Sequence, residues 1–413
     1  MGRPFLSSIP HSSRYMHNLR YRCMIVACIL ALLQQQYLYT SYRLSLAAKY
    51  SPTTFSFDYQ ATRALLEKPV NQETSFQQNL IAHRALWKVL GKGWEGTVYT
   101  YNESVIKTFL PQSPLRNCAP GEDNVKWPTE IPGNLYFGGT GLGNQIEDDS
   151  QTTRNRTSDG FLPVEGFFKI STSPSDPPEW HLVTPLLRNG NLNTLAKKLL
   201  QEEQSKTVHE RDVRFRPAFN QLLVTLDTLH SSGYCHDDIK PDNIFVRDES
   251  HWVLGDLGNL RNILHPYHKS RLWKSNQQLA DCRANDTIRL LKSYLKFIRS
   301  SLDADSFNME LYDGQAPLGR LFWWALADAH TLSAVELQRR SLIENPTSPS
   351  ENSMNEASFA PAVHQHLWSL IPRRTALRYA ADRILMTQMS EKAARWWAMV
   401  WLFGVPVPDL CGV

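Results

Sequence analysis

Three glycines lie close together in Gly91-Lys92-Gly93-Trp94-Glu95-Gly96, at a spacing typical of loops that bind phosphate groups. Glycine adopts positive φ angles and lets backbone N–H groups approach phosphate oxygens. In dinucleotide sites this pattern leads from a strand into a helix, whereas here residues 86–90 and 97–101 both read as strands. The pattern therefore indicates a loop folded over nucleotide phosphates, with a plain glycine-rich hairpin as the alternative.

Lys107 follows Gly96 by eleven residues and lies between apolar neighbours on a strand expected at residues 105–109. A buried ammonium group without a partner is costly. Phosphate groups on one side and a carboxylate on the other would both stabilise it. The sequence therefore predicts that Lys107 contacts phosphates and an acidic side chain.

The strongest candidate for a catalytic segment is Tyr234-Cys235-His236-Asp237-Asp238-Ile239-Lys240-Pro241-Asp242-Asn243-Ile244-Phe245-Val246. Asn243 follows Asp238 by five residues, and Asp256-Leu257-Gly258 begins thirteen residues after Asn243. Together with the glycine-rich loop and Lys107, in this order, these motifs resemble the protein kinase superfamily. The segments 126–131 and 183–187 resemble divergent stand-alone kinase-like proteins of filamentous fungi.

The resemblance implies an α+β, bilobal protein-kinase-like fold with a small β-rich lobe and a larger helical lobe. It also implies transfer of the γ-phosphate of ATP to Ser/Thr hydroxyls of a protein, with Mg²⁺. Asp238 would orient the acceptor hydroxyl and take its proton, and Lys240 would neutralise charge on the phosphoryl group. Asn243 and Asp256 would bind Mg²⁺. The residues implied to bind ATP are Gly91, Lys92, Gly93, Gly96, Val98, Lys107, Thr184 and Leu186.

The same resemblance implies that a helix glutamate pairs with Lys107. Glu130 is expected to be this residue, because Pro128 can occupy the first position of a helix. Pro132 would keep that helix short. Glu122 is the alternative partner.

Three features depart from the family's pattern. Asp237 stands where the arginine before the catalytic aspartate is usual, so activation by phosphorylation of the activation loop is not expected. No APE motif follows Asp256, although Asp286 matches the buried aspartate near the start of a long central helix. The resemblance covers residues 86–300 and leaves the later helices unmatched.

Two other functions stay open beside an active protein kinase. A pseudokinase scaffold would bind nucleotide without transfer, which the missing APE motif favours. A small-molecule kinase is favoured by the short activation segment. Lys240 argues for a protein acceptor, because small-molecule kinases of similar fold usually carry histidine at that position.

Composition excludes several classes. The 413 residues are 42% hydrophobic and 20% charged, as in a globular protein. A net charge of +4 gives no nucleic-acid signature, so no nucleic-acid partner is expected. Six cysteines are too few for a disulfide scaffold, and Cys235 is expected to be a buried thiol.

The first 57 residues contain no Asp or Glu, and residues 23–33 form an apolar run. This leader fits a signal sequence or membrane anchor, with Arg14, Arg20 and Arg22 on the cytoplasmic flank. A mitochondrial presequence and a buried helix are the alternatives. The expected location is therefore cytoplasmic, or membrane-anchored through residues 23–33.

Hydrophobic patterns divide the rest of the chain. Strands are expected at 86–90, 97–101, 105–109, 167–170 and 181–184, and helices at 58–85, 193–200, 217–229 and 359–404. The tryptophans of the last helix are expected in the core. The expected divisions are a leader (1–57), an amino-terminal lobe (58–187) and a carboxy-terminal lobe with a divergent extension (188–413).

Overall fold

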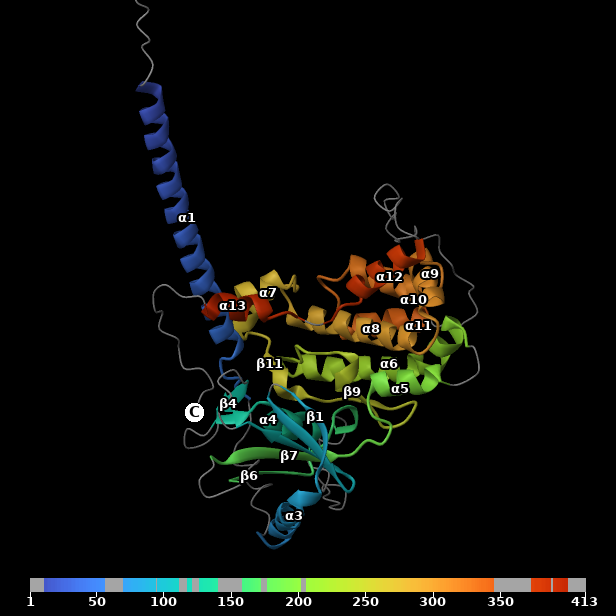
Figure 1. Cartoon of the computed structure of the whole chain (residues 1–413). Coiled ribbons are helices and arrows are strands. Elements are labelled where there is room, and N and C mark those ends of the chain that lie inside the picture. Colours follow the sequence, from blue (N-terminus) through green and yellow to red (C-terminus); the bar gives the residue numbers. More distant parts are fainter. Residues whose placement is uncertain are drawn as a thin grey trace, which may run out of the picture.

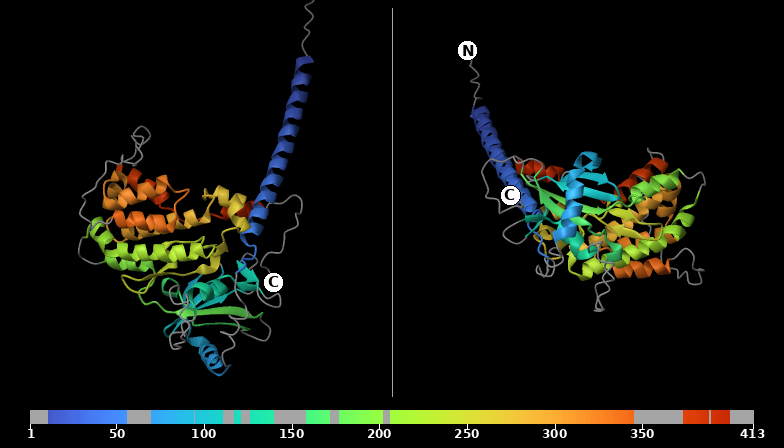
Figure 2. Two further views of the ribbon diagram at one scale, coloured as in Figure 1. Left: turned by 180° about the vertical axis from the view of Figure 1, so that it is seen from behind. Right: turned by 90° about the horizontal axis from the view of Figure 1, so that it is seen from below.

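The computed structural model describes residues 11–55, 70–93, 95–110, 117–120, 126–139, 158–171, 177–201, 206–344, 373–387 and 389–399. Within them a sheet lobe lies against a larger helical lobe, as Figures 1 and 2 show from three sides. This arrangement confirms the α+β, bilobal fold that the sequence predicts.

The sheet lobe contains a five-stranded antiparallel sheet in the order β1-β2-β3-β7-β6. Its strands have the β-branched and aromatic residues that favour a pleated, half-buried surface. Each expected strand is present: β1 (Lys88–Lys92), β2 (Gly96–Tyr101), β3 (Ser104–Phe109), β6 (Gly166–Ile170) and β7 (Glu179–Pro185). Of the helix expected at 58–85, the described part is α3 (Val70–Ala82), followed by a short 3₁₀ turn, η1 (Arg84–Leu86).

The helical lobe is built around α6 (Val208–Ser231) and α8 (Cys282–Ser300). Between these helices Phe219 stacks on Tyr294, and Phe215 meets Phe297 edge to face. The other helices of this lobe are α5 (Leu192–Leu200), α9 (Ala304–Asp313), α10 (Pro317–Ala327), α11 (Ala334–Ile343) and α12 (Arg373–Ile384). The expected start of a helix at residue 217 is wrong. Thr207 and Glu210 form a reciprocal capping box, so α6 begins at Val208 and Pro217 lies inside it.

Short elements connect the lobes and surround the space between them. Two small ladders pair β4 (Cys118–Pro120) with β5 (Lys126–Pro128) and β9 (Ile244–Val246) with β10 (Trp252–Leu254). A third pairs β8 (Tyr234–Cys235) with β11 (Arg261–Asn262). The single turns and short helices are η4 (Ser158–Gly160), η5 (Pro241–Asn243), η6 (Leu257–Asn259), η7 (Pro266–Lys269), α4 (Glu130–Gly138) and α7 (Arg271–Ser275).

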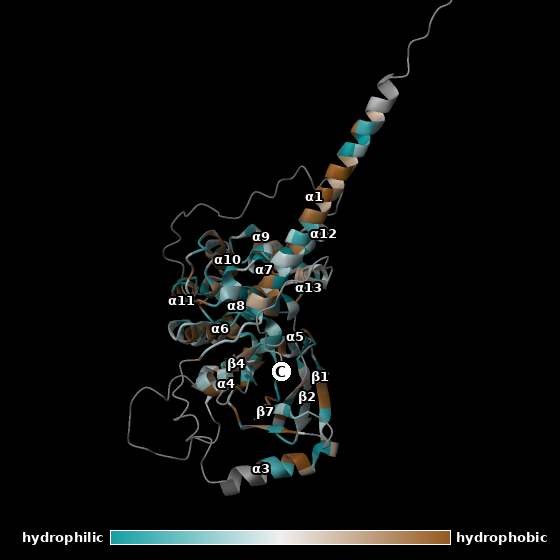
Figure 3. Ribbon diagram, turned by 90° about the vertical axis from the view of Figure 1, so that its left-hand side faces the viewer, coloured by the Kyte–Doolittle hydropathy of each residue, from teal (hydrophilic) through white to brown (hydrophobic). Residues whose placement is uncertain are grey.

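The leader forms one long helix, α1 (His11–Lys49), which projects away from both lobes (Figure 1). Its carboxy-terminal part packs against α7 and α13 (Lys392–Met399). Ser45 Oγ accepts a hydrogen bond from Leu272 N at 3.3 Å, and Lys49 forms an ion pair with Glu391. The apolar run 23–33 is exposed (Figure 3), so the alternative of a buried helix is wrong for that run.

The tryptophans of α13 do not lie in the core as expected. Trp396 is 52% exposed and Trp397 is half-buried, with their rings in edge contact. The helix is oriented instead by Ala394, which is buried against α1 and α7. Trp401 and Phe403 lie outside the described residues.

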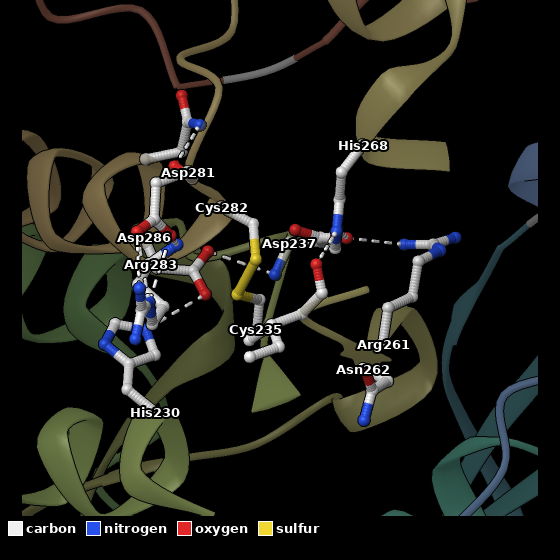
Figure 4. Close-up of a disulfide and its surroundings, with 12 residues drawn as sticks. His230, Cys235, Asp237, Arg261, Asn262, His268, Asp281, Cys282, Arg283 and Asp286 are labelled. Atoms are coloured by element: carbon white, nitrogen blue, oxygen red, sulfur yellow. Dashed lines mark hydrogen bonds and ion pairs between the residues drawn. A yellow bond between two sulfur atoms is a disulfide. The ribbon is translucent and has the colours of Figure 1, made fainter. Parts of the chain in front are cut away.

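Cys235 is buried, but it is not the free thiol that the sequence predicts. It forms a disulfide with Cys282, the first residue of α8, across 47 positions (Figure 4). Cys118 is also disulfide-bonded. The low cysteine content argues against a disulfide-rich scaffold, but it says nothing about single cross-links placed between distant elements.

Removal of the Cys235–Cys282 bond is expected to destabilise the helical lobe. The loop that the bond closes corresponds to roughly 2–4 kcal/mol of stabilisation through the unfolded state. The double variant Cys235→Ala/Cys282→Ala should therefore unfold at lower temperature or urea concentration than the wild type. The variant Cys23→Ser/Cys28→Ser removes two free, exposed thiols and should unfold like the wild type. Equal midpoints for all three proteins would contradict a stabilising role.

His181, on β7, lies in the apolar core of the sheet lobe. Its Nδ1 is 2.9 Å from Thr108 Oγ1, and the rings of Trp87 and Phe168 pack against it. Burial, with a smaller effect from Arg84, lowers the pKa of His181 to about 4. The folded protein therefore holds this imidazole neutral at pH values where the unfolded chain protonates it.

This shift predicts acid sensitivity. Between about pH 6.5 and 4 the unfolded state binds one more proton at His181, so the free energy of unfolding falls as pH falls, by up to about 1.4 kcal/mol per pH unit. His181→Gln should flatten the pH dependence of urea unfolding in that window by about one proton. His330→Gln, at an exposed position, is the control. A slope that His181→Gln does not alter would contradict the assignment.

Candidate active site

The glycine-rich segment forms the turn between β1 and β2. Gly93 N donates to Gly96 O at 2.9 Å and closes this turn. A Cβ atom at Gly96 would clash with Thr108 O, so only glycine fits there. A Cβ atom at Gly91 would meet nothing within 4 Å, and one at Gly93 would meet only Gly96 O, at 3.9 Å. Lys92 is the exposed last residue of β1. The turn therefore presents an open backbone above the sheet.

Lys107 lies on β3, directly opposite Val98 on β2. Its Nζ donates to Glu130 Oε2 and, at 3.1 Å, to Asp256 Oδ1. The Lys107 side chain is 19% exposed and that of Glu130 is 7% exposed. The structure thus brings together the strand lysine, the helix glutamate and the aspartate of the Asp256-Leu257-Gly258 motif.

The helix that carries Glu130 differs from expectation at both ends. It begins at Glu130 itself, with Thr129 before it, and Pro128 belongs to β5 rather than to the helix. Pro132 does not shorten it, because a proline in the first turn gives up an N–H that has no partner within the helix. The helix continues to Gly138. Glu122, the alternative partner, lies outside the described residues.

Charge balance keeps Lys107 and Asp256 ionised, whereas burial, only partly offset by Lys107, raises the pKa of Glu130 to about 7. Burial alone would lower the pKa of Lys107, but Asp256 and Glu130 raise it well above its ordinary value. Burial would likewise raise the pKa of Asp256, but Lys107 lowers it. Lys107 is therefore a cation and Asp256 an anion at neutral pH.

Glu95 was not singled out from the sequence, yet it belongs to this cluster. Its charge also raises the pKa of Lys107, and a side chain at Gly258 would lie 3.3 Å from Glu95 Oε2. The carboxylate therefore lies beneath the glycine-rich turn, near the lysine. The sequence contained one signal that could have identified Glu95: it is an acidic residue inside a glycine-rich loop that is expected to bind phosphate anions.

The second group of candidate residues lies in the turn after β8. Lys240 Nζ donates to Asp238 Oδ2 at 2.7 Å. Asn243 Nδ2 donates to the Asp238 backbone oxygen at 3.0 Å and to Oδ2 at 3.3 Å. Burial alone would lower the pKa of Lys240, but Asp238 raises it, with a smaller effect from Asp256. The electrostatic contact with Asp256 connects this group to the Lys107 cluster.

Oxygen ligands suit Mg²⁺. Asp256 offers a carboxylate, and Asn243 retains its side-chain oxygen because its amide nitrogen is occupied by Asp238. Gly255 N donates to Asn243 O at 3.0 Å, which places the two segments side by side. The donors present therefore fit the divalent cation that the sequence predicts here.

The remaining candidate residues lie at the junction of the lobes. Thr184 is buried on β7 opposite Val105 of β3. Leu186 follows the end of β7, and its N–H donates to Glu103 O at 2.6 Å. Both lie where the chain leaves the sheet for the helical lobe, and their contact with adenine stays a prediction.

The turn at residues 236–243, which follows β8, is called the catalytic turn after the role predicted for it, and Asp237 is its most unusual residue. It has a positive φ of 63°, and its side chain is fully buried. Its Oδ2 accepts hydrogen bonds from Arg261 Nη1 at 3.1 Å and from His268 Nε2 at 2.9 Å (Figure 4). Burial would raise the pKa of Asp237, but His268 and Arg261 lower it below its usual range. Asp237 is therefore an anion that lies between Arg261 and His268.

Arg261 and His268 both belong to the segment that follows Asp256. Arg261 also donates to Asn259 O at 2.8 Å, Asn117 Oδ1 at 2.7 Å and Lys49 O at 3.2 Å. One buried guanidinium thus joins the catalytic turn, the segment after Asp256, the strand region near β4 and the end of α1.

Comparison with known proteins agrees with this geometry. The family described as the protein kinase domain matches residues 166–280, which include both motif segments of the helical lobe. "Serine/threonine-protein kinase UCNL" of Arabidopsis thaliana is 25% identical over 185 residues, covering 43% of this chain and 38% of that protein. "Serine/threonine-protein kinase D" of Synechocystis is 35% identical over 97 residues, or 23% of this chain and 17% of that protein.

"Serine/threonine-protein kinase PknD" of Chlamydia trachomatis is 24% identical over 176 residues, covering 42% of this chain and 16% of that protein. The chain therefore spans well under half the length of these relatives. The fold, the matched domain and the relatives agree on one class and together support membership of the protein kinase superfamily.

The contacts of Asp237 predict a large loss of stability when its charge is removed. Asp237→Asn keeps the shape and tolerates the positive φ, but leaves Arg261 and His268 facing a neutral amide. The free energy of urea unfolding should fall by about 3 kcal/mol. Asp328→Asn, at an exposed aspartate, should cost less than about 0.5 kcal/mol.

A double-mutant cycle isolates the pair. Asp237→Asn combined with Arg261→Gln should destabilise the protein by clearly less than the sum of the single variants, because the second change removes the charge that the first left unpaired. Additive effects would show that the two groups do not interact.

Proposed function

We propose that this chain is an active kinase that uses ATP and Mg²⁺ to phosphorylate Ser or Thr hydroxyls of a protein. The observation that carries the proposal is the contact of Lys107 with both Glu130 and Asp256. Through it, β3 of the sheet lobe contacts the Asp256-Leu257-Gly258 segment of the helical lobe. The amino-terminal lobe would span residues 58–187 and the carboxy-terminal lobe 188–413.

Each residue then has a physical task. The backbone of the Gly91–Gly96 turn would cover the phosphates, and Lys107 would hold the α- and β-phosphates, positioned by Glu130. The nucleobase would lie near Val98, Thr184 and Leu186. Bound Mg²⁺, held by Asn243 and Asp256, would neutralise charge on the phosphate groups.

Phosphoryl transfer has a loose transition state, so positioning and charge neutralisation supply most of the rate. Asp238 would accept the proton of the attacking hydroxyl, and Asn243 fixes its carboxylate through Oδ2. Lys240, 2.7 Å from the same oxygen, would face the transferring phosphoryl group once substrate binds. The acceptor is expected to be a protein because Lys240 occupies a position where small-molecule kinases usually carry histidine.

The Asp237–Arg261 contact bears on regulation. In this family an arginine before the catalytic aspartate usually binds a phosphate group on the activation segment. Here the anion is Asp237, on the catalytic turn itself, and the segment supplies Arg261 and His268. The segment is therefore ordered without phosphorylation, and the enzyme is proposed to be active as synthesised.

The test is transfer of labelled γ-phosphate from Mg-ATP to generic protein acceptors and to the chain itself. Asp238→Asn should lower the rate at least about a hundredfold, because it removes the base that takes the hydroxyl proton. Asp242→Asn is the matched control, since Asp242 is an exposed carboxylate four residues away. Phosphatase treatment of the wild type before the assay should leave its rate unchanged.

Other outcomes separate the alternatives. Binding of Mg-ATP without transfer to any acceptor would favour a scaffold pseudokinase, and transfer only to small metabolites would favour a small-molecule kinase. A chain that does not bind Mg-ATP at all would contradict the assignment of the nucleotide site.

A further inference from the structure

The amino-terminal part of α1 is exposed all round. Every residue from Asn18 to Gln34 is exposed, and this stretch includes the apolar run 23–33 (Figure 3). The uncharged stretch that contains this run, residues 23–42, has 20 residues. At about 1.5 Å per residue it is about 30 Å long, which matches the ~30 Å hydrocarbon core of a bilayer. Apolar surface on every side of an isolated helix is unfavourable in water and favourable in lipid.

The charges around this stretch are unevenly distributed. No charged side chain occurs between Arg22 and Arg43, and α1 is long and apolar enough to cross a membrane. Arg14, Arg20 and Arg22 precede the apolar run, and no acidic residue precedes Asp58. On the other side, Arg43 and Lys49 follow the uncharged stretch, and Lys49 forms an ion pair with Glu391. The positive-inside rule counts the basic residues within about 15–20 residues of a span, so the end with Arg14, Arg20 and Arg22, rather than the end with Arg43 and Lys49, lies in the cytosol.

The cysteines provide independent evidence about the compartment in which the folded lobes lie. Cys23 and Cys28, inside the apolar run, are free. Cys235 and Cys282 form a disulfide, and Cys118 is also disulfide-bonded. Disulfides persist in oxidising compartments and are rare in the cytosol. The folded lobes therefore lie on the oxidising side, which is the side that the charge distribution predicts for them.

We propose that α1 spans a membrane with its amino-terminal end in the cytosol, and that the kinase fold lies in the lumen of the secretory pathway. In forming the Cys235–Cys282 bond, the two thiols lose two protons and two electrons to a disulfide-containing oxidoreductase, which is reduced to a dithiol. The substrate class, which rests on the proposed function, is then lumenal or extracellular protein rather than cytosolic protein.

One modification site follows from this location. Asn102 lies at the exposed tip of the β2–β3 turn with a φ of 52°, and Asn102-Glu103-Ser104 is a glycosylation sequon. Asn285 begins a second sequon but is buried, and its Nδ2 donates to Leu279 O at 3.0 Å and Asp281 O at 2.9 Å. Asn102 is therefore the described asparagine that can carry a glycan on the folded protein.

The experiment uses the full chain, tagged at its carboxyl terminus, in sealed microsomes from eukaryotic cells. The tag should resist added protease until detergent opens the vesicles, and the protein should resist alkaline extraction. A maleimide–polyethylene glycol probe, applied to the denatured protein, should add two more adducts after reduction to the wild type than to Cys235→Ser/Cys282→Ser. A tag digested in sealed vesicles, or full labelling without reductant, would overturn the proposal.

A matched variant tests the role of α1. Ile25→Glu/Ile29→Glu/Leu33→Glu changes three side chains that are at least half exposed, so the fold should persist while membrane insertion is lost. This variant should become soluble and fully thiol-labelled. A soluble wild-type oligomer would show instead that α1 packs against a second copy, and cleavage of the chain after the apolar run would show a signal sequence. Either result would overturn the membrane anchor.

The glycan gives a second readout. Because Asn155-Arg156-Thr157 is a further sequon, outside the described residues, the test is made in an Asn155→Gln background. Endoglycosidase should decrease the apparent mass of Asn155→Gln, and adding Asn102→Gln should abolish that shift. No shift in Asn155→Gln, or one that survives the addition of Asn102→Gln, would contradict the assignment of Asn102. None of these measurements needs phosphate transfer, and Asp238→Asn should give the same topology as the wild type. A failure of the proposed activity can thus be told apart from a failure of the proposed topology.

Discussion

The buried carboxylate of Asp286 fixes the catalytic turn to the central helix, and most of the site depends on this contact. It accepts the backbone N–H groups of His236 at 2.6 Å and Asp237 at 3.1 Å. The Cys235–Cys282 bond joins the same turn to the same helix (Figure 4). His236 then contacts Gly255 O at 3.1 Å, so the positions of Asp238 and Asp256 relative to each other follow from α8.

At Asp237 the charges are the reverse of the arrangement usual in the family, because the carboxylate lies on the catalytic turn and the arginine, Arg261, on the segment after Asp256. This ion pair is the second contact on which the site depends. A buried carboxylate is costly unless it is paired and hydrogen-bonded. Arg261 and His268 meet that requirement, and both come from the segment after Asp256. Because the ion pair is contained within the chain, order in this segment is a property of the fold itself rather than of a modification.

Local signals in the sequence were sufficient for the sheet and for the spacing of the motifs. β-branched and aromatic runs identified all five strands, and the intervals from Asp238 to Asn243 and Asp256 identified the superfamily. Contacts between distant segments were harder to predict. Nothing in the sequence pairs Cys235 with Cys282, or Asp237 with Arg261, because such contacts depend on how far-apart elements pack. The start of α6 was available in Thr207 and Glu210, but Pro217 was given more weight.

The attachment of α1 has a mechanical consequence. Beyond Gln34 the helix continues without a break to Lys49, where Arg261 binds its last carbonyl and Ser45 receives Leu272 N. No loose tether separates the exposed part of α1 from the lobes within the described chain. Whatever surface holds the exposed part therefore sets the height and tilt of the candidate site. In the kinase proposed above, acceptor hydroxyls would then be selected by their distance from that surface as well as by their sequence.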